Sequence, residues 1–285
     1  MSMQVKAANL NSRQKEILNH ARIRGEVQVE QLADTFGVTP QTIRRDLNQL
    51  RELGLLHRVH GGAIVHDGVA NLGYQARRRI LSEEKESIAH CAAQLIPDDT
   101  SLFINIGTTT EQVARHLESR VGLLVITNNI NVANTLRGCE TIQVMTAGGL
   151  VRREDGGIVG DATVDFISQF KVDFAVVGAS AIEEDGTVLD YDPREVSVAQ
   201  AIIANARSVI LVADSTKFER NAPIRIADIS NVDYFVTDRM PSPAFTAICR
   251  ERGVTLVIAE GNRCNAVVDH RKRIKKLHPS SGKVN

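Results

Sequence analysis

A chain of 285 residues is long enough for about two domains, and its 43% hydrophobic and 24% charged residues are typical of a globular protein. No apolar run reaches the roughly 18–20 residues that cross a bilayer, and the first residues lack the apolar core of a signal peptide, so we expect a cytoplasmic protein with no membrane partner. The net charge of zero conceals two basic ends: residues 1–62 carry nine Lys and Arg against six Asp and Glu, and residues 262–285 carry seven against one. This distribution favours an anionic polymer bound at one end of the chain.

The four cysteines are far apart in the sequence. Cys91, Cys139, Cys249 and Cys264 show neither CxxC nor Cys/His ligand spacing. We therefore expect reduced, mostly structural thiols, with no zinc site, no other metal, no cofactor and no disulfide framework.

Three helices are predicted near the N-terminus. Residues 12–25 place apolar side chains on one helical face, and a second short helix is predicted from Val29 to Phe36. Gly37 can then re-aim the chain, because glycine tolerates the tight turn of a helix-turn-helix. Thr39 as N-cap and Pro40 at the first helical position predict the third helix.

The third helix has two different faces. Ile43, Leu47 and Leu50 share one side, and the opposite side carries Arg, Gln and Asn, which can bind guanine and adenine edges in the major groove. The next residues, LLHRVHGGAIVHDG, predict a β-hairpin wing around two glycines. The residues expected to contact DNA are Thr39, Gln41, Thr42, Arg44, Arg45, Asn48, Arg58 and His60. An ordinary solvated face is the alternative for the two adjacent arginines.

The string TPQTIRRDLNQLRELGLLHRVHGGA closely resembles the helix-turn-helix signature of the DeoR family of bacterial regulators. The resemblance covers the recognition helix and the wing together. We expect a winged helix-turn-helix domain over residues 9–66 and a linker over 67–81, whose three adjacent arginines serve an exposed hinge or contact the DNA backbone. An α/β domain over 82–260 and a basic tail over 261–285 are expected to follow. The tail is either a solvated terminus or an arm that adds affinity for phosphates.

Seven short apolar runs alternate with helical segments after Ser82. They are SLFINI, LLVIT, IQVMT, VDFAVVG, SVILVA, VDYFVT and TLVIA. Continuous apolar strands separated by helices predict a mostly parallel sheet covered on both faces, so the fold class is α/β. In such folds the ligand lies beyond the carboxyl ends of the strands.

The residues at those strand ends are small and polar. Backbone N–H groups, three hydroxyls and a helix N-terminus are expected to face one spot after the first run, an arrangement suited to phosphate, although a simple capped helix is the alternative. A lysine after the fifth run supplies a counter-charge, and asparagines can bind hydroxyls. The residues expected at this site are Gly107, Thr108, Thr109, Thr110, Asn128, Asn129, Gly148, Gly149 and Lys217.

The stretches INIGTTTEQVA, TNNINVANTL, DGGIVGDATVDFISQF and DSTKFERNA resemble the effector domains of DeoR-family members that respond to glycerol 3-phosphate. The resemblance implies a fold related to ribose-phosphate isomerases, a ligand that relieves repression, and the pocket residues named above. At two positions this chain departs from the family. The family usually has Asp where this chain has Asn105, and often has Lys where it has Ala199. Asp190 and Glu195 are candidates for polyol hydroxyls, with a surface role at a helix start equally open for Glu195.

These patterns favour a homo-oligomer, a dimer or a tetramer, that binds double-stranded operator DNA and a sugar or polyol phosphate. The resemblance implies that it represses genes of glycerol metabolism and that glycerol 3-phosphate is the ligand that releases it. Two other functions stay open: a regulator that binds another sugar phosphate, and an isomerase-like enzyme with an appended DNA-binding module. Proton transfer in such an enzyme needs a carboxylate near the substrate, which Asn105 cannot supply. We therefore expect a sensor without catalytic residues.

Overall fold

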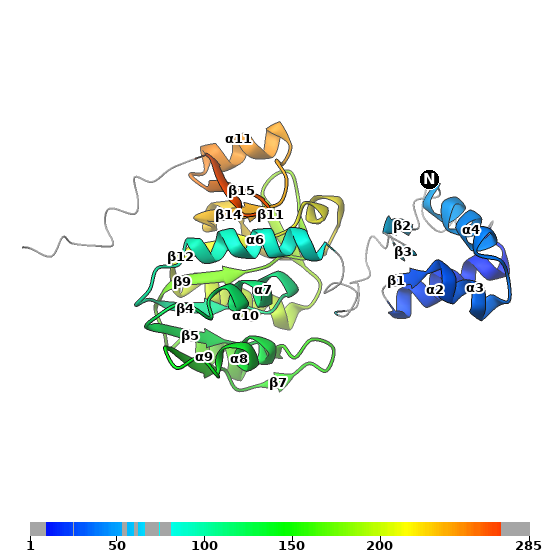
Figure 1. Cartoon of the computed structure of the whole chain (residues 1–285). Helices are drawn as coiled ribbons and strands as arrows, with labels where there is room; N and C mark the ends of the chain where they lie inside the picture. The colour runs from blue at the N-terminus through cyan, green and yellow to red at the C-terminus, as the bar shows by residue number, and fades with distance from the viewer. Residues whose placement is uncertain are drawn as a thin grey trace, which may run out of the picture. The chain divides into compact units, whose positions relative to one another are not determined.

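The computed structural model describes residues 10–24, 26–52, 56–59, 62–65, 74 and 81–268. The chain divides into two compact units, Met1–Ser82 and Glu83–Asn285. Element labels follow Figure 1. Among the described residues, no helix is long and apolar enough to cross a membrane.

The described residues of the N-terminal unit form three helices and a small sheet. The helices are α2 (Ser12–Arg24), α3 (Val29–Phe36) and α4 (Pro40–Glu52), and the strands are β1 (Glu26–Gln28), β2 (Leu56–Val59) and β3 (Gly62–Val65). Gly37 ends α3 in the left-handed conformation at φ 62°, as the turn requires. The predicted helices and hairpin are confirmed, and β1 adds a third strand that the sequence did not predict, in the order β1-β3-β2.

An eight-stranded sheet forms the centre of the C-terminal unit, in the order β16-β15-β14-β12-β9-β4-β5-β6. Its strands are β4 (Ser101–Ile104), β5 (Leu123–Thr127), β6 (Ile142–Thr146), β9 (Val172–Val177), β12 (Ala206–Val212), β14 (Tyr234–Thr237), β15 (Thr255–Glu260) and β16 (Arg263–Val268). Every pairing is parallel except that of β15 with β16. All seven predicted runs are strands, and the predicted fold class is confirmed.

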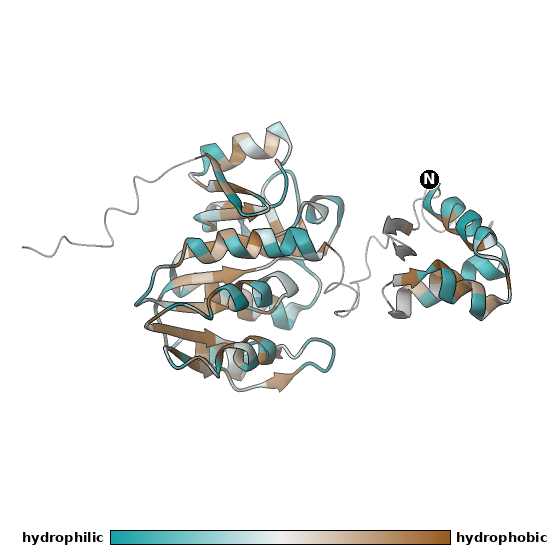
Figure 2. Cartoon of the chain, viewed as in Figure 1, coloured by the Kyte–Doolittle hydropathy of each residue, from teal (hydrophilic) through white to brown (hydrophobic). Residues whose placement is uncertain are grey.

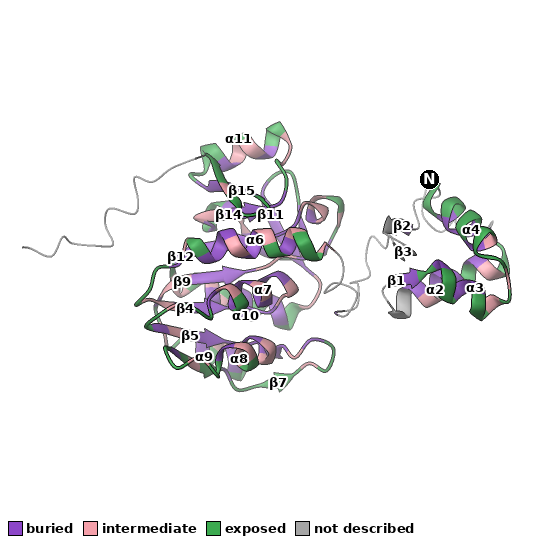
Figure 3. Cartoon of the chain, viewed as in Figure 1, coloured by how far each residue is buried: buried purple, intermediate pink, exposed green. Residues whose placement is uncertain are grey.

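Helices cover both faces of this sheet, because alternate strand residues point to opposite sides. On one face, Ile104 packs with α6 (Ser82–Gln94), α7 (Thr108–His116) and α8 (Ile130–Leu136). On the other, Phe103 packs with α9 (Asp161–Ile167), α10 (Pro193–Ala204) and α11 (Pro243–Glu251). The strands are brown in Figure 2 and purple in Figure 3, which shows the apolar, buried centre.

Smaller elements surround the strand ends. The hairpin of β7 (Leu150–Val151) and β8 (Ile158–Val159) follows β6, and β10 (Ala181–Ile182), β11 (Thr187–Asp190) and β13 (Ile224–Asp228) form a separate sheet. Two 3-10 helices, η2 (Ser215–Glu219) and η3 (Ile229–Asn231), follow β12 and β13. The sequence indicated none of these, because strands of two to five residues are too short to show a period.

Two predictions about the C-terminal region are wrong. The sheet pattern was expected to end near residue 260, but β16 continues the sheet from Arg263 to Val268. All four thiols were expected to be reduced, but Cys91 of α6 and Cys264 of β16 form a disulfide with their Cα atoms 5.5 Å apart. The two errors have different causes: the disulfide partners are separated by 173 residues, a distance at which local spacing carries no signal, whereas β16 was missed because its side chains are mostly exposed and form no apolar run.

Candidate functional site

Helix α4 presents a polar face to solvent because its apolar face is fixed in the N-terminal core. Ile43 and Leu50 are fully buried, whereas the predicted reading residues Gln41, Arg44, Arg45 and Asn48 are exposed. The Thr39 hydroxyl accepts the Thr42 N–H at 3.3 Å, as expected of an N-cap. Four long polar side chains on one face of a rigid helix suit the major groove.

A polar contact that the sequence did not predict holds α4 in place. Asp46 is buried on the packed side of α4 and receives the guanidinium of Arg13 at 2.6 Å and the amide of Gln14 at 3.3 Å, both from α2. Arg44 lies 3.6 Å from Glu30 of α3, and both side chains are more than half exposed, so that ion pair contributes little to stability. Arg44 can therefore leave Glu30 and bind a phosphate or a base edge with little loss of stability.

The predicted wing is present as backbone. Arg58 lies in β2 opposite Ala63 of β3. The side chain of Arg58 and the whole of His60 lie outside the described residues, as do the three linker arginines.

The carboxyl ends of the parallel strands gather the second group of candidate residues. Gly107 precedes α7 at φ 152°, and a Cβ there would lie 3.1 Å from the Thr110 hydroxyl. That hydroxyl is buried and hydrogen bonds the carbonyl oxygens of Asn105 and Gly107, each at 2.8 Å. The expectation that all three threonine hydroxyls face a ligand is therefore wrong for Thr110, whose hydroxyl instead fixes the loop. Thr108 is half-buried and Thr109 is buried.

The two asparagines after β5 have different roles. Asn129 uses both ends of its amide within the protein: its oxygen caps α8 by accepting the Asn131 N–H at 2.9 Å, and its nitrogen donates to Glu111 at 3.1 Å. Asn128 donates to the Ile158 carbonyl at 3.1 Å, and among the described residues its buried Oδ1 has no hydrogen-bond partner. The same is true of the Oδ1 of Asn105, at the end of the neighbouring strand β4. Two buried oxygens without donors suit ligand hydroxyls.

Lys217 belongs to a buried charged group at the end of β12. Its ammonium lies 4.0 Å from Asp214, and both side chains are buried. Burial alone would raise the pKa of Asp214, but the charge of Lys217, the hydrogen bond from Thr216 and the charge of Lys85 outweigh it and lower that pKa. Lys85, buried in the first turn of α6, was missed by the sequence analysis; a charged residue inside an otherwise apolar helix face was the available signal.

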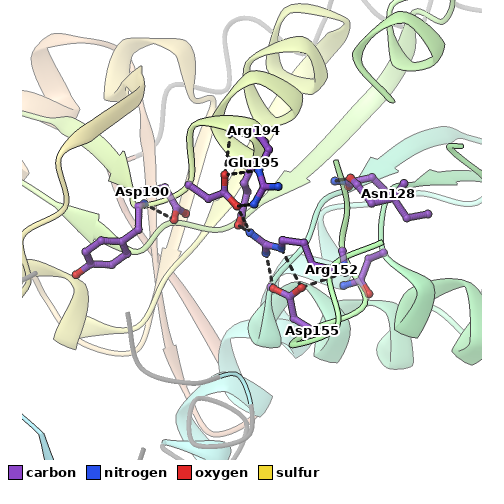
Figure 4. A network of polar contacts seen from close by, with 12 residues as sticks. Asn128, Arg152, Asp155, Asp190, Arg194 and Glu195 are labelled. Carbon is purple, nitrogen blue, oxygen red and sulfur yellow. Dashed lines mark hydrogen bonds and ion pairs between the residues drawn. The ribbon is translucent and has the colours of Figure 1, made fainter. Parts of the chain in front are cut away.

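Arg152 is the centre of a third polar group (Figure 4). It follows β7 and forms ion pairs with Asp155, with Glu195 at 2.6 Å and with Asp192 at 3.2 Å. Burial alone would lower the pKa of Arg152, but Glu195 and Asp155 outweigh it and raise that pKa. Glu195 is therefore neither a surface residue nor a carboxylate open to a ligand in this state. Arg152 and Asp155 were not among the residues predicted from the sequence.

The turn between β7 and β8 lies against the strand ends. Gly157 forms a bridge with Asn129, and a Cβ on Gly157 would lie 2.5 Å from Ile106 of the loop after β4. Arg152 joins the same turn to the first residues of α10, which follow the Asp192 N-cap. One turn thus connects β5, the loop after β4 and α10.

The remaining candidates have structural partners. A Cβ on Gly149, at φ 151°, would lie 2.3 Å from the Thr163 hydroxyl, so this glycine allows close packing of α9. Gly148 accepts a hydrogen bond from the same hydroxyl at 2.9 Å. Asp190 accepts the Ser180 hydroxyl at 3.0 Å and lies at the end of β11. No cluster of His, Cys, Asp and Glu among the described residues is suited to a metal ion.

Two family models match the chain. A DeoR-like helix-turn-helix domain matches residues 13–69, and a DeoR C-terminal sensor domain matches residues 81–239. Together they cover both the exposed α4 face and the strand-end residues.

Several proteins are similar over nearly the full length. The glycerol-3-phosphate regulon repressor of Escherichia coli is 44% identical over 244 residues, which cover 86% of this chain and 97% of that protein. The repressor of the same name from Haemophilus influenzae is 44% identical over 253 residues, 87% of this chain and 98% of that protein. Ribose 5-phosphate isomerase A from Neisseria gonorrhoeae is 12% identical with a TM-score of 0.35, covering 47% of this chain and 52% of the other, a likeness too small to carry an argument. The chain belongs to the DeoR family of transcription regulators.

Proposed function

We propose that this protein is a cytoplasmic repressor of genes for glycerol 3-phosphate metabolism, and that glycerol 3-phosphate releases it from operator DNA. The similarity of 44% over 97% of the Escherichia coli regulon repressor carries the proposal. The exposed face of α4 reads the operator, and the strand ends of the sensor domain bind the effector. We keep the predicted domains: the DNA-binding domain over 9–66, the linker over 67–81, the sensor domain over 82–260 and the basic tail over 261–285. One boundary changes, because β16 pairs with β15 and is assigned to the sensor domain.

The phosphate group binds beside the first turn of α7. Gly107 and Thr108 offer backbone N–H groups at the helix N-terminus, where the helix dipole favours a negative charge. Lys217 and Lys85 supply positive charge in a buried setting, where both charges lower the pKa of Asp214. A dianionic phosphate beside these lysines is therefore attracted through charge-assisted hydrogen bonds.

The glycerol part binds beside Asn105 and Asn128, which directly follow β4 and β5 at the carboxyl ends of these strands. Their side-chain oxygens are acceptors, and a polyol hydroxyl is a donor. Asn105 is suited to this role although the family usually has Asp there, because an amide oxygen accepts a hydrogen bond as a carboxylate does. Asp190 and Glu195 border this region and take part only if their bonds to Ser180 and Arg152 rearrange.

Effector specificity is tested by calorimetric titration of the full chain with glycerol 3-phosphate, glycerol, inorganic phosphate and a panel of hexose and pentose phosphates. We expect glycerol 3-phosphate to bind with the highest affinity, and saturating amounts to weaken operator binding in a mobility-shift titration. Coupling of about 1–3 kcal/mol corresponds to 5- to 150-fold weaker binding. Tight binding of another sugar phosphate, with none of glycerol 3-phosphate, refutes the ligand assignment. Unchanged operator affinity at saturating effector refutes release.

Operator reading is tested with Arg45→Ala, and Lys15→Ala is the matched control because it removes the same charge from an exposed position of α2. Loss of a base contact costs about 1–3 kcal/mol, so Arg45→Ala should weaken operator binding at least several-fold more than the control. Equal losses for the two variants would show that α4 contributes only general charge.

The repressor acts as a homo-oligomer, and β6 is the surface proposed to meet a second copy. β6 is an outer strand whose far edge carries no paired strand in the described sheet, and Thr141 to Val151 contains no charged residue. Natural edge strands usually carry charge or proline, and two copies of a neutral strand can pair antiparallel about a twofold axis without like-charge repulsion. Met145, Leu150 and Val151 are 39%, 58% and 46% exposed beside this edge, where β7 is brown in Figure 2 and green in Figure 3.

Light scattering after gel filtration tests this surface with Met145→Lys. Met240→Lys is the matched control. Met240 is 52% exposed and follows β14, which lies toward the opposite edge of the sheet from β6. We expect Met145→Lys alone to lower the oligomer mass. A wild-type monomer, or an unchanged mass for Met145→Lys, refutes this surface.

A further inference from the structure

Strand β16 is attached to the sensor domain by one neighbouring strand and one covalent link. Among the described strands it pairs only with β15, antiparallel, from Glu260↔Arg263 to Leu256↔Val268. From residue 261 to residue 267 every side chain is exposed except that of Cys264, which is half-buried. Burial of apolar side chains therefore contributes little to the attachment of β16, and the link through Cys264 carries an unusual share of it.

The partner of Cys264 lies in the first helix of the sensor domain. Cys91 is 1% exposed on the side of α6 that packs against the sheet. Its sulfur also lies 3.6 Å from the carbonyl oxygen of Arg263, so a reduced Cys91 thiol has an acceptor for its proton. The site thus accommodates both the disulfide and the two thiols.

We propose that Cys91 and Cys264 form an oxidation site, in which the disulfide locks β16 onto α6 and reduction releases the strand. The more exposed Cys264 thiolate attacks a disulfide such as oxidised glutathione, which expels one glutathione thiolate. The Cys91 thiolate then attacks the Cys264 sulfur of the mixed disulfide and expels the second. Two protein thiols and one oxidised glutathione become one protein disulfide and two reduced glutathiones, and the reverse reaction restores the thiols.

The position of the Cys91–Cys264 disulfide in the chain indicates that its effect does not depend on the effector. β16 lies beyond residue 239, where the match to the sensor-domain family ends, and the basic run RKRIKK begins three residues after it in the sequence. Disulfides of proteins in reducing compartments are typically transient and redox-sensing. Oxidation here fixes the last described strand before the basic run, whichever ligand the sensor binds.

Thiol mapping tests the chemistry. The full chain is equilibrated with oxidised or reduced glutathione, alkylated and analysed by peptide mass. With oxidised glutathione we expect Cys91 and Cys264 to be protected together and joined in one peptide pair, while the half-buried Cys139 is alkylated. Burial raises the pKa of the Cys249 thiol to about 11, so Cys249 should react only after denaturation. Pairing of Cys264 with Cys139, or no pairing, overturns the site.

Hydrogen exchange tests the lock. Amides of β15 and β16 should exchange at least tenfold more slowly in the oxidised than in the reduced wild-type chain. Cys264→Ser should match the reduced wild type under both conditions, and Cys139→Ser should retain the difference. Closing so long a loop should also raise the Tm of the oxidised chain by roughly 5–15 °C. If the disulfide forms while β16 exchanges equally fast in both states, the lock is wrong although the oxidation site stands.

Discussion

Replacing Arg152 by methionine removes a cation of the β7–β8 turn that forms ion pairs with Asp155 of the same turn and with Glu195 of α10. The Arg152 side chain is 12% exposed, and those of Asp155 and Glu195 are 3% and 11% exposed. Asp192 retains Arg194 at 3.0 Å, so it keeps one partner. The buried carboxylates of Asp155 and Glu195 then each lose an ion pair and face an apolar side chain, while Asp155 keeps the N–H of Gly157 at 3.1 Å.

The expected loss of stability is large because a buried charge without its partner is poorly solvated. Removing one member of a buried ion pair costs about 3–5 kcal/mol at neutral pH, and here two carboxylates are affected. Water reaching the turn can reduce the cost, so we take this range as the expectation for the sensor domain. Replacing Arg153, the exposed neighbour, by methionine should cost less than about 0.5 kcal/mol.

The pH dependence separates this cause from a simple packing defect. In the wild type, burial alone would raise the pKa of Asp192, but hydrogen bonds from Arg194 and Arg152 outweigh it and lower that pKa to about 2. A lowered folded pKa stabilises the protein above the unfolded value of about 4, and this stability is lost as the pH falls toward 2. Without Arg152, Asp192 loses one of the hydrogen bonds that lower its pKa, so the difference between wild type and variant should shrink as the pH falls from about 4 toward 2.

Urea unfolding followed by tyrosine fluorescence measures this difference, because the chain has three Tyr and no Trp and two of the tyrosines, Tyr191 and Tyr234, lie in the sensor domain. A loss for Arg152→Met no larger than for Arg153→Met refutes the reasoning. A loss that is the same at pH 7 and at about pH 3 assigns the effect to packing instead.

Two further substitutions have matched controls. Lys217→Ala should weaken binding of the effector by about 10- to 100-fold, as expected for a lost charge-assisted hydrogen bond, and leave operator binding without effector unchanged. Lys171→Ala replaces an exposed lysine of the same domain and should change neither affinity. Equal effector affinity for the two variants in calorimetry contradicts the phosphate assignment. Gly149→Ala should destabilise the sensor domain by more than about 1 kcal/mol, because its Cβ would lie 2.3 Å from a side chain and 2.9 Å from a backbone oxygen. Gly148→Ala is the control, because a Cβ on Gly148 meets nothing within 4 Å. Similar unfolding midpoints for the two alanine variants would show that this region relaxes freely.

The elements that could be predicted from the sequence are those with a regular pattern of apolar residues. Helix α3 has the predicted bounds, Val29–Phe36, and the apolar run of each central strand is found at its predicted place, because burial on both faces requires continuous apolar residues. β16 has no such pattern. Its side chains are exposed apart from Cys264, so main-chain pairing and a cross-link hold it without an apolar signature.

The candidate site was predictable to the extent that it follows strand order. Gly107, Asn128 and Lys217 lie at carboxyl ends because parallel strands end at one edge of the sheet. The contacts of Arg152 with Glu195 join segments 43 positions apart through a turn with no apolar period. No local spacing reveals such a pair, and the same holds for Lys85 and Asp214.

Lys85 suggests how effector binding is transmitted in the proposed mechanism. It lies in the first turn of α6, the helix that directly follows the linker predicted over 67–81, and its charge acts on Asp214 beside Lys217. A phosphate bound near Lys217 competes with Asp214 for both lysines, so the effector acts on the residues that begin the sensor domain and not only on its interior. Such a ligand changes operator affinity only if it binds two arrangements of this helix unequally. Because α6 also carries Cys91, any rearrangement of the helix must either carry β16 with it while the disulfide is intact or leave β16 behind once the disulfide is reduced.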